Sequence, residues 1–388
     1  MRDVASQASP GYDEPVRSGA LMLTLVKRLV SSETLNNTAN GDRMVILGSG
    51  GARIVVAKQL RASGGIWFSL AGTRFLVDPG PGSLVRTTGS RHRLDPTKLA
   101  GILLSHRHLD HSGDVNNMIE AMTMGGTEPR GALFAPSDAL GGDDPVVLKY
   151  VRPFLERIVT LEEGGAYQLG NVRFTCPVRH QHRGEVYGFR FQAGGLSADY
   201  ADDADSAGRR QKSEGRMQKA EVGTGPSTDY ADYTDYVGRG QKAEGADEES
   251  TTKAPRHEGA SERSSVVGPR SSLTVSYIAD TKYFPELAEH YRADVVIMNV
   301  VRPQPSNLDH LHAPDAEELV KAIRPRLAVL SHFGMKMLQA KPWVIAREMS
   351  ERTGCKVVAA SDGMLVDLEQ FKAPIPNSQL LTPNQGAA

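Results

Sequence analysis

The sequence predicts an α/β fold in which helices cover the outer faces of β-sheets, interrupted by one disordered internal insertion. Three observations predict it. The first half of the chain holds short apolar runs separated by turn residues, as in β-hairpins. The second half alternates strand-like and helix-like segments. Between the two halves, residues 195–271 contain almost no Leu, Ile or Phe, so they cannot contribute to a hydrophobic core.

Each predicted element is justified by its own apolar pattern and by the turn residues that end it. In the first half we predict strands at residues 43–47, 66–70, 74–77, 99–105, 133–135, 172–176 and 187–191, and a helix at 116–124. In the second half we predict strands at residues 273–279, 294–298, 327–330 and 356–360, and helices at 283–291, from 314 onward and at 343–353. Without the insertion, these elements make one domain of about 290 ordered residues.

The predicted domain spans residues 41–370 and is interrupted by the insertion at 195–271. Residues 1–40, with a lead-in helix, and residues 371–388 are expected to be flexible ends. The insertion cannot bury enough apolar surface to offset the entropy of ordering it, so we expect a disordered loop within a surface hairpin. It contains a tandem repeat, in which residues 197–202 and 208–215 recur as residues 227–232 and 238–245.

The composition excludes several classes of protein. The 45 Lys and Arg residues balance 46 Asp and Glu residues, so the net charge does not indicate a nucleic-acid partner or an anionic membrane. Two cysteines are too few for a disulfide framework and fit a reducing compartment. The apolar stretch at residues 20–30 is interrupted by charge and is too short to span a bilayer. We therefore expect a cytoplasmic protein without membrane contact, and the composition leaves a homodimer open.

Residues 106–111 have the sequence HRHLDH, which places four potential metal ligands within six residues. Imidazoles and carboxylates at this density are costly to withdraw from water unless they bind a partner. His106 and His108 alternate along an extended segment and point the same way, while Asp110 and His111 follow on a turn. The motif therefore predicts two adjacent metal positions. Because the ligands are His and Asp, Zn²⁺, Mn²⁺ or Fe²⁺ would suit them.

Further His and Asp candidates lie where predicted strands end, the usual place for binding groups on a rigid scaffold. They are His180, His182, Asp280, His310, His312 and His332. Asp78, in the turn that ends the first hairpin, is a candidate ligand or a residue that bonds to the backbone of its own turn. As a third role, we expect Asp78 to orient the ligating imidazoles.

These residues together resemble the metallo-β-lactamase superfamily. The resemblance rests on residues 105–114, SHRHLDHSGD, and is supported by the sequences FLVDPG at 75–80, IADT at 278–281 and LSHFG at 330–334. It covers residues 43 to about 368 apart from the insertion. The resemblance implies an αββα sandwich with two metals at one edge between the sheets.

The resemblance also implies a set of metal ligands. They are His106, His108 and a third histidine for one metal, and Asp110, His111 and His332 for the other. Asp280 would bridge the two metals. The nearest branch is the ribonuclease Z-like, transfer-RNA 3′-processing one, in which the third histidine precedes a Gly-aromatic-Arg-hydrophobic strand. The interval to residues 188–191, GFRF, favours His182 over His180.

The same branch places a further histidine ahead of a helix, and His310 matches this position better than its rival His312. Two cations roughly 3.5–4 Å apart would turn a bridging water into a hydroxide nucleophile. We expect Asp110 and Asp280 to act in catalysis by holding the cations. His310 or His312 would stabilise developing charge or protonate the leaving group. We expect two Zn²⁺ per chain, with Mn²⁺ or Fe²⁺ as alternatives.

The predicted activity is metal-dependent hydrolysis of a phosphodiester of small-molecule or nucleotide type. The pair His310 and His312 and the LSHF sequence near the end favour this substrate class. The chain has no long Gly- and Pro-rich arm of the kind that transfer-RNA processing members use to hold their substrate. Hydrolysis of an acyl substrate, such as a lactone or a thioester, is the alternative on the same site. A non-catalytic metal-binding or interaction protein is the alternative of another class.

Overall fold

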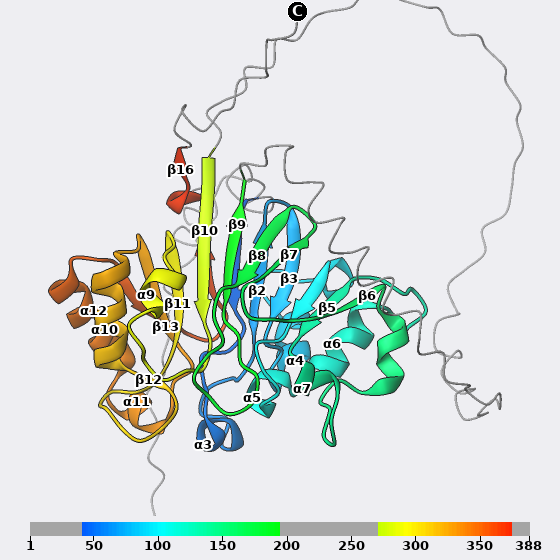
Figure 1. Cartoon of the computed structure of the whole chain (residues 1–388), viewed down its shortest axis with the longest axis horizontal. Coiled ribbons are helices and arrows are strands. Elements are labelled where there is room, and N and C mark those ends of the chain that lie inside the picture. The colour runs from blue at the N-terminus through cyan, green and yellow to red at the C-terminus, as the bar shows by residue number, and fades with distance from the viewer. Residues whose placement is uncertain (1–40, 195–270, 375–388) are drawn as a thin grey trace, which may run out of the picture. The chain divides into compact units, whose positions relative to one another are not determined.

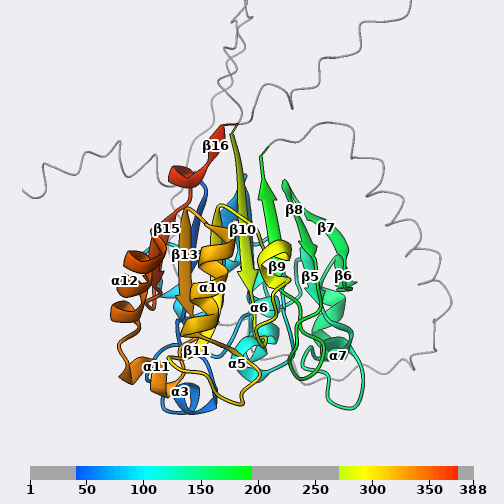
Figure 2. The same cartoon turned by 60° about the vertical axis from the view of Figure 1, so that its left-hand side comes forward.

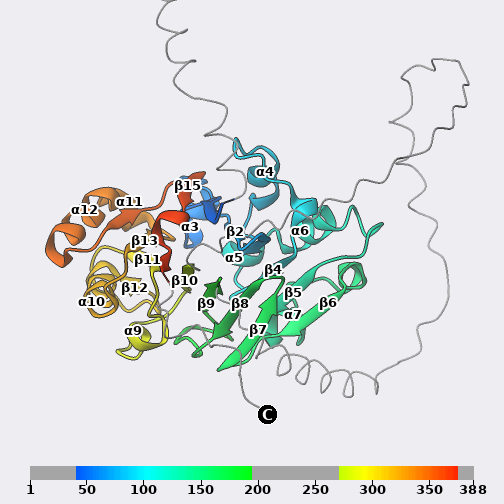
Figure 3. The same ribbon diagram turned by 90° about the horizontal axis from the view of Figure 1, so that it is seen from above.

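The computed structural model describes residues 41–194 and 271–374 (Figure 1). Our expectations for residues 1–40, for the insertion up to residue 270 and for residues 375–388 lie outside the described residues. Two β-sheets face each other across one apolar core, and a further apolar layer under helices covers the outer face of each sheet. Figure 3 shows α10 and α12 on one side of the sheets and α6 on the other. The predicted αββα sandwich is confirmed.

The first sheet has seven strands in the order β15-β1-β2-β3-β4-β5-β6. They are β1 (Arg43–Ile46), β2 (Ile66–Leu70), β3 (Thr73–Val77), β4 (Gly101–Leu103), β5 (Ala132–Ala135), β6 (Arg157–Thr160) and β15 (Met364–Asp367). Strands β15 to β3 pair antiparallel, and β3 to β6 pair parallel. Every residue of β4 and β5 is buried, because the core covers one face of these parallel strands and helices cover the other.

The second sheet has the strand order β14-β13-β11-β10-β9-β8-β7, with β12 beside β11 and β16 beside β10. Its strands are β7 (Gly165–Leu169), β8 (Val172–Cys176), β9 (Phe189–Ala193), β10 (Ser271–Ile278), β11 (Val295–Arg302), β12 (Leu311–His312), β13 (Leu327–Ser331), β14 (Val357–Ala359) and β16 (Ala373–Pro374). Strands β7 to β10 pair antiparallel, and β10, β11, β13 and β14 pair parallel. Ala193 of β9 pairs with Leu273 of β10, so the segment between them connects the two strands of one hairpin, as predicted.

Aromatic side chains fill the core between the sheets. Phe68 and Phe75 of the first sheet stack with their ring centroids 5.0 Å apart. Phe191 of the second sheet lies 5.3 Å from Phe68 and 5.1 Å from Phe75, and all three rings are fully buried. Because each Phe removes roughly 150–250 Å² from water, this cluster fixes the separation of the sheets. The strand ends at the edge of the sandwich are therefore held in place.

Helices cover both outer faces. On the first sheet they are α6 (Val115–Met122), α7 (Ser137–Leu140) and the 3₁₀ helices at Pro96–Lys98 and Lys149–Phe154. On the second sheet they are α9 (Leu287–His290), α10 (Ala313–Ile323), α11 (Met335–Gln339) and α12 (Pro342–Thr353). The remaining helices are α3 (Arg53–Ala57), α4 (Ser83–Thr88), α5 (Leu109–Ser112) and the 3₁₀ helix Glu369–Phe371. In α10, Ala316, Leu319, Val320 and Ile323 are buried at helical spacing, which fixes the face that meets the sheet.

The structure differs from the predicted boundaries at both ends of the second half. The helix predicted at 283–291 is shortened to α9, because the residues around Pro285 form turns. Residues 371–374, which we predicted to belong to a flexible tail, are part of the domain, because Phe371 is buried in the core and β16 pairs with β10. The edge strands β6, β7 and β15 were not predicted, because their exposed faces interrupt the apolar pattern.

No helix in the described part of the chain is long and apolar enough to cross a membrane.

The pairing of β9 with β10 generates a prediction about the connection between them. Replacing residues 195–270 by a four-residue turn should preserve the melting temperature (Tm), because the strands already pair up to Ala193 and Leu273. Loop-closure entropy favours the shorter connection by about 2 kcal/mol. Differential scanning calorimetry of the full chain and the shortened chain would measure the difference. A Tm lowered by more than about 5 °C would show that the segment stabilises the domain.

Candidate metal centre

The predicted ligands come together where strands of both sheets end. Strand β4 leads into the loop that carries His106 and His108 and then into α5. Strand β10 ends two residues before Asp280, and β13 is followed directly by His332. Figures 1 and 2 show α5 near this end of β10 and β11. The loops at the ends of rigid strands therefore position the site.

One group of potential ligands contains three histidines and an aspartate. Its members are His106, His108, His182 and Asp280, each with a ligand atom within 4.8 Å of the others. His106 Nε2 lies 3.0 Å from His108 Nδ1, and His182 Nε2 lies 3.3 Å from the same His108 atom. The three ring nitrogens thus converge on one point from two separate loops.

A second group contains Asp110, His111 and His332. His111 Nε2 lies 2.9 Å from His332 Nε2, and Asp110 Oδ2 lies 3.3 Å from the same His332 atom. Asp280 lies between the groups, because its Oδ2 is 3.5 Å from His111 Nε2 and 3.8 Å from His106 Nε2. The structure therefore brings together every ligand of the implied two-metal set.

The separations and the hydrogen bonds of these imidazoles fit bound cations. Two nitrogens that bind one tetrahedral Zn²⁺ at 2.0–2.1 Å lie about 3.3 Å apart, close to the separations observed here. His182 Nδ1 donates to the Asp309 carbonyl at 2.7 Å, and His111 Nδ1 donates to Asp78 Oδ2 at 2.9 Å. These bonds place the ring protons on Nδ1, so the Nε2 lone pairs face the convergence points. A cation is the partner that converging lone pairs require.

Burial controls the protonation of the first group. Burial lowers the pKa of the His106 imidazole well below 6.5, and neighbouring His111 lowers it further. Burial is also the main cause that lowers the pKa values of His108 and His182. All three imidazoles are consequently neutral at pH 7, which is the form that binds metal.

Carboxylates control the second group. Burial disfavours the charged form of His111, but three nearby carboxylates outweigh burial and raise the pKa of this imidazole well above 6.5. They belong to Asp280, Asp110 and Asp78. Burial also disfavours the Asp280 carboxylate, but His332, His111 and His310 outweigh burial and hold its pKa well below its usual value. The carboxylates thus attract positive charge to a buried position, and a divalent cation would supply this charge in place of the proton on His111 Nε2.

Of the two candidates for the third histidine, the structure brings His182 to the first group and leaves His180 outside it. His180 is buried, and its Nε2 lies 2.7 Å from the Tyr291 hydroxyl. Its Nδ1 donates to the Asp280 carbonyl at 3.3 Å. Both ring nitrogens therefore serve the packing of the strand ends, and neither faces His106 or His108.

The two candidates ahead of α10 also differ in position. His310 Nε2 lies 3.1 Å from Asp280 Oδ2, so this imidazole borders the ligand groups. His312 is the N-cap residue of α10, and its Nδ1 donates to Asp315 Oδ2 at 2.8 Å. Its Nε2 lies 3.0 Å from both the backbone nitrogen and the hydroxyl of Ser306. His312 therefore serves the start of the helix, and only His310 contacts the candidate metal centre.

Three polar residues around the ligands were missed or left ambiguous by sequence reasoning. Asp78 accepts hydrogen bonds from Ser105, His111 and Tyr277, which matches the orienting role. Tyr277 and Asn299, both buried, were not predicted. Asn299 could have been noticed as the single polar side chain in the buried run VVIMNVV at 295–301. Tyr277 gives no such signal, because tyrosine is common in strands.

Backbone conformation brings the ligands close to neighbouring loops. Asp78 and His332 have positive φ values of 51° and 60°, which side-chain-bearing residues adopt rarely. A Cβ atom at Gly51 would lie 2.2 Å from His332 Nδ1. Gly51 is therefore required for the close approach of its loop to the ligand ring.

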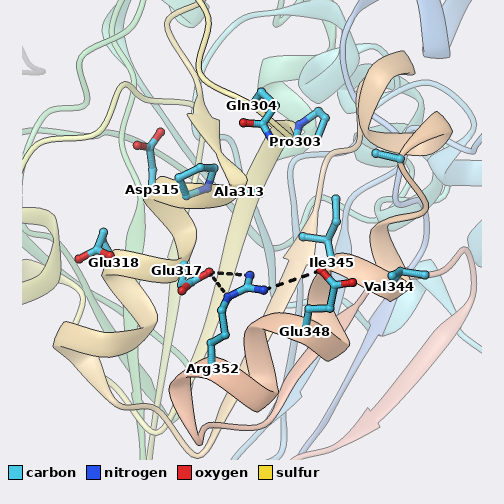
Figure 4. Close-up of a pocket in the computed structure, with 12 residues that line it drawn as sticks. Pro303, Gln304, Ala313, Asp315, Glu317, Glu318, Val344, Ile345, Glu348 and Arg352 are labelled. Carbon is cyan, nitrogen blue, oxygen red and sulfur yellow. Dashed lines mark hydrogen bonds and ion pairs between the residues drawn. The ribbon is translucent and has the colours of Figure 1, made fainter.

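A pocket between α10 and α12 lies outside both ligand groups (Figure 4). It is lined by the acidic side chains of Asp315, Glu317 and Glu348 and by apolar residues such as Val344. Arg352 Nη2 donates to Glu317 Oε2 at 2.7 Å, and Nη1 lies 3.7 Å from Glu348 Oε2. Because its charges are paired and it contains no predicted ligand, we do not place the reaction there.

Comparison with known proteins agrees with the fold. A family model described as the beta-lactamase superfamily domain matches residues 73–234. An uncharacterized protein of Methanocaldococcus jannaschii is 25% identical over 332 residues, which cover 84% of this chain and 94% of that protein. It is named without an activity.

Two solved structures share the fold. The metallo-beta-lactamase fold protein YhfI from Bacillus subtilis is 14% identical, with a TM-score of 0.53 over 84% of this chain and 99% of YhfI. The long form of ribonuclease Z from yeast is 13% identical, with a TM-score of 0.50 over 86% of this chain and 42% of that enzyme. The αββα sandwich, the HRHLDH loop at the sheet edge and the match to the family model over residues 73–234 together support a place in the metallo-β-lactamase superfamily.

Proposed function

We propose that this protein is a hydrolase that uses two divalent metal ions, Zn²⁺ by preference and Mn²⁺ or Fe²⁺ as alternatives, to cleave phosphodiester bonds. The observation that carries the proposal is the position of Asp280 Oδ2. This oxygen lies within 4 Å of a histidine from each ligand group and 3.1 Å from His310 Nε2. Two ligand groups that share one carboxylate and border one further imidazole suit hydrolysis at a dinuclear centre.

The roles of the ligand residues follow from their positions. His106, His108 and His182 would hold one cation, and Asp110, His111 and His332 would hold the other. Asp280 would bridge the two. Bound together, the two cations supply an activated water and Lewis-acid polarisation of the scissile group. The backbone nitrogen of Ala52 donates to Asp110 Oδ2 at 3.1 Å and fixes the direction of this carboxylate.

His310 is suited to proton transfer. Burial disfavours its charged form, but the Asp280 carboxylate outweighs burial and raises the pKa of this imidazole above 6.5. It can therefore hold a proton near neutral pH beside the reaction centre and deliver it to a leaving oxygen. An alkoxide leaves readily when it gains a proton, so this position supports a substrate with an alkoxide leaving group, as in a phosphodiester. The shared fold of yeast ribonuclease Z is consistent with it.

The metal content provides the first test. Purified protein reconstituted with Zn²⁺ should hold two equivalents by inductively coupled plasma mass spectrometry. Asp110→Asn should hold close to one, because the second group would lose its only carboxylate apart from the shared Asp280. His92→Asn, outside both groups, should keep two. Fewer than two equivalents in the wild-type protein would contradict the dinuclear proposal.

The roles of His310 and His312 can be separated by kinetics. With a phosphodiester that expels an alkoxide as substrate, such as a dinucleotide, His310→Ala should lower kcat by about 10²- to 10⁴-fold while the metal content stays at two. His312→Ala should mainly lower Tm, because it removes the imidazole that bonds to Asp315 and Ser306 at the start of α10, each bond being worth about 1 kcal/mol. The assignment of the proton donor would be wrong if His312→Ala had the larger effect on kcat.

The substrate class is tested by a panel of small substrates. We expect the Zn²⁺-loaded or Mn²⁺-loaded protein to hydrolyse bis-p-nitrophenyl phosphate with a higher kcat/KM than simple lactones or thioesters. The reverse order would favour the acyl alternative on the same site. Hydrolysis of neither class by a protein with two bound metals would favour a non-catalytic role.

A further inference from the structure

Two buried polar side chains lie behind the ligand groups and are not needed to bind metal. Tyr277 lies on β10 and Asn299 on the neighbouring strand β11, and both are nearly inaccessible to solvent. Asn299 is flanked by apolar residues on both sides in β11. Burying a hydroxyl and an amide in such a core is costly unless each is hydrogen-bonded. The burial of these two polar side chains therefore indicates a role besides packing.

The donor and acceptor roles in this pair are determined by the number of protons available. The Asn299 amide donates one proton to the Tyr277 hydroxyl oxygen at 3.1 Å and one to Asp280 Oδ1 at 2.9 Å. The Tyr277 hydroxyl proton is then free to go to Asp78 Oδ2, 2.8 Å away. Burial raises the pKa of the Tyr277 phenol well above 10, so the hydroxyl keeps this proton.

The Asp78 carboxylate connects Tyr277 to both ligand groups. It accepts from His111 Nδ1 at 2.9 Å and from the Ser105 hydroxyl at 2.7 Å. Because the Ser105 hydroxyl donates its one proton to Asp78, its oxygen accepts from His106 Nδ1, 2.9 Å away. One carboxylate thereby fixes the tautomer of one histidine in each group.

We propose that Tyr277 and Asn299 are positioning residues that tie Asp78 to Asp280 and thereby set the two metal positions relative to each other. The inference rests on the proposed dinuclear function. Asn299 engages Asp280 Oδ1 and leaves Oδ2 to face His106 and His111. Tyr277 holds the carboxylate that orients these two imidazoles. The connection also joins the sheets, since Asp78 follows β3 and Tyr277 lies in β10.

The test compares two variants with a matched control. Tyr277→Phe removes only the hydroxyl, and Asn299→Leu replaces the amide by a branched apolar group with the same number of heavy atoms. Tyr167→Phe is the control, because it also removes a hydroxyl from this sheet. Among the described residues, the Tyr167 hydroxyl accepts from the Glu162 backbone nitrogen at 2.7 Å and contacts neither ligand group. Zn²⁺ affinity is measured by competition with a chromogenic chelator, and the absorption spectrum of the Co²⁺-substituted protein reports the ligand geometry.

We expect Tyr277→Phe and Asn299→Leu each to weaken Zn²⁺ binding about 10- to 100-fold and to change the Co²⁺ spectrum. The double variant should lose less affinity than the product of the two single losses, because both act through one connection. The control should retain wild-type affinity and spectrum.

Two results would overturn the inference, and they differ from each other. If the variants lower the Tm of the metal-free protein but bind Zn²⁺ like the control, the two residues serve stability alone while the dinuclear function stands. If the wild-type protein holds fewer than two metals, the proposed function fails and the inference fails with it.

Discussion

The carboxylate of Asp78 receives hydrogen bonds from segments of the chain that are far apart in sequence. Ser105 and His111 approach it from the loop and helix after β4, and Tyr277 approaches from the opposite sheet. Asp78 itself ends a strand of the first sheet with a positive φ of 51°, which turns its side chain away from the strand. The relative positions of the sheets, the HRHLDH loop and Asp280 all depend on this buried carboxylate, because each is connected to it directly or through Tyr277 and Asn299.

The sandwich allows one carboxylate to contact segments from both sheets, because it places strand ends of the two sheets at one edge. The Phe68, Phe75 and Phe191 cluster fixes the separation of the sheets without contributing to the site. The loops that follow β4, β10 and β13 can therefore be short, and each presents its first ligand within one to three residues of the strand. A rigid apolar layer and short loops together give the precision that a dinuclear centre requires.

The residue types of the site were predictable from sequence, because His and Asp at strand ends have few alternative explanations. The choice between His180 and His182 was harder. It depends on Tyr291, more than 100 residues away in sequence, whose hydroxyl lies 2.7 Å from His180 Nε2. Asn299 and Tyr277 were missed for a similar reason, since the partners that make a buried polar group useful belong to other strands. The edge strands were missed because half of their residues face solvent.

The site is organised by the protein itself, and this affects how metal binding contributes to stability. The positive φ values of Asp78 and His332 cost of order 1–3 kcal/mol each, and surrounding bonds must hold them. Around His332, the backbone nitrogen of Phe333 donates to the Ser49 carbonyl at 2.9 Å, and Gly51 packs against the ring. These contacts are made by protein groups alone, and they hold the ligand nitrogens together at the expense of folding stability. Cations that bind the folded site and not the unfolded chain would stabilise the domain. Their affinity and the free energy of unfolding are therefore linked.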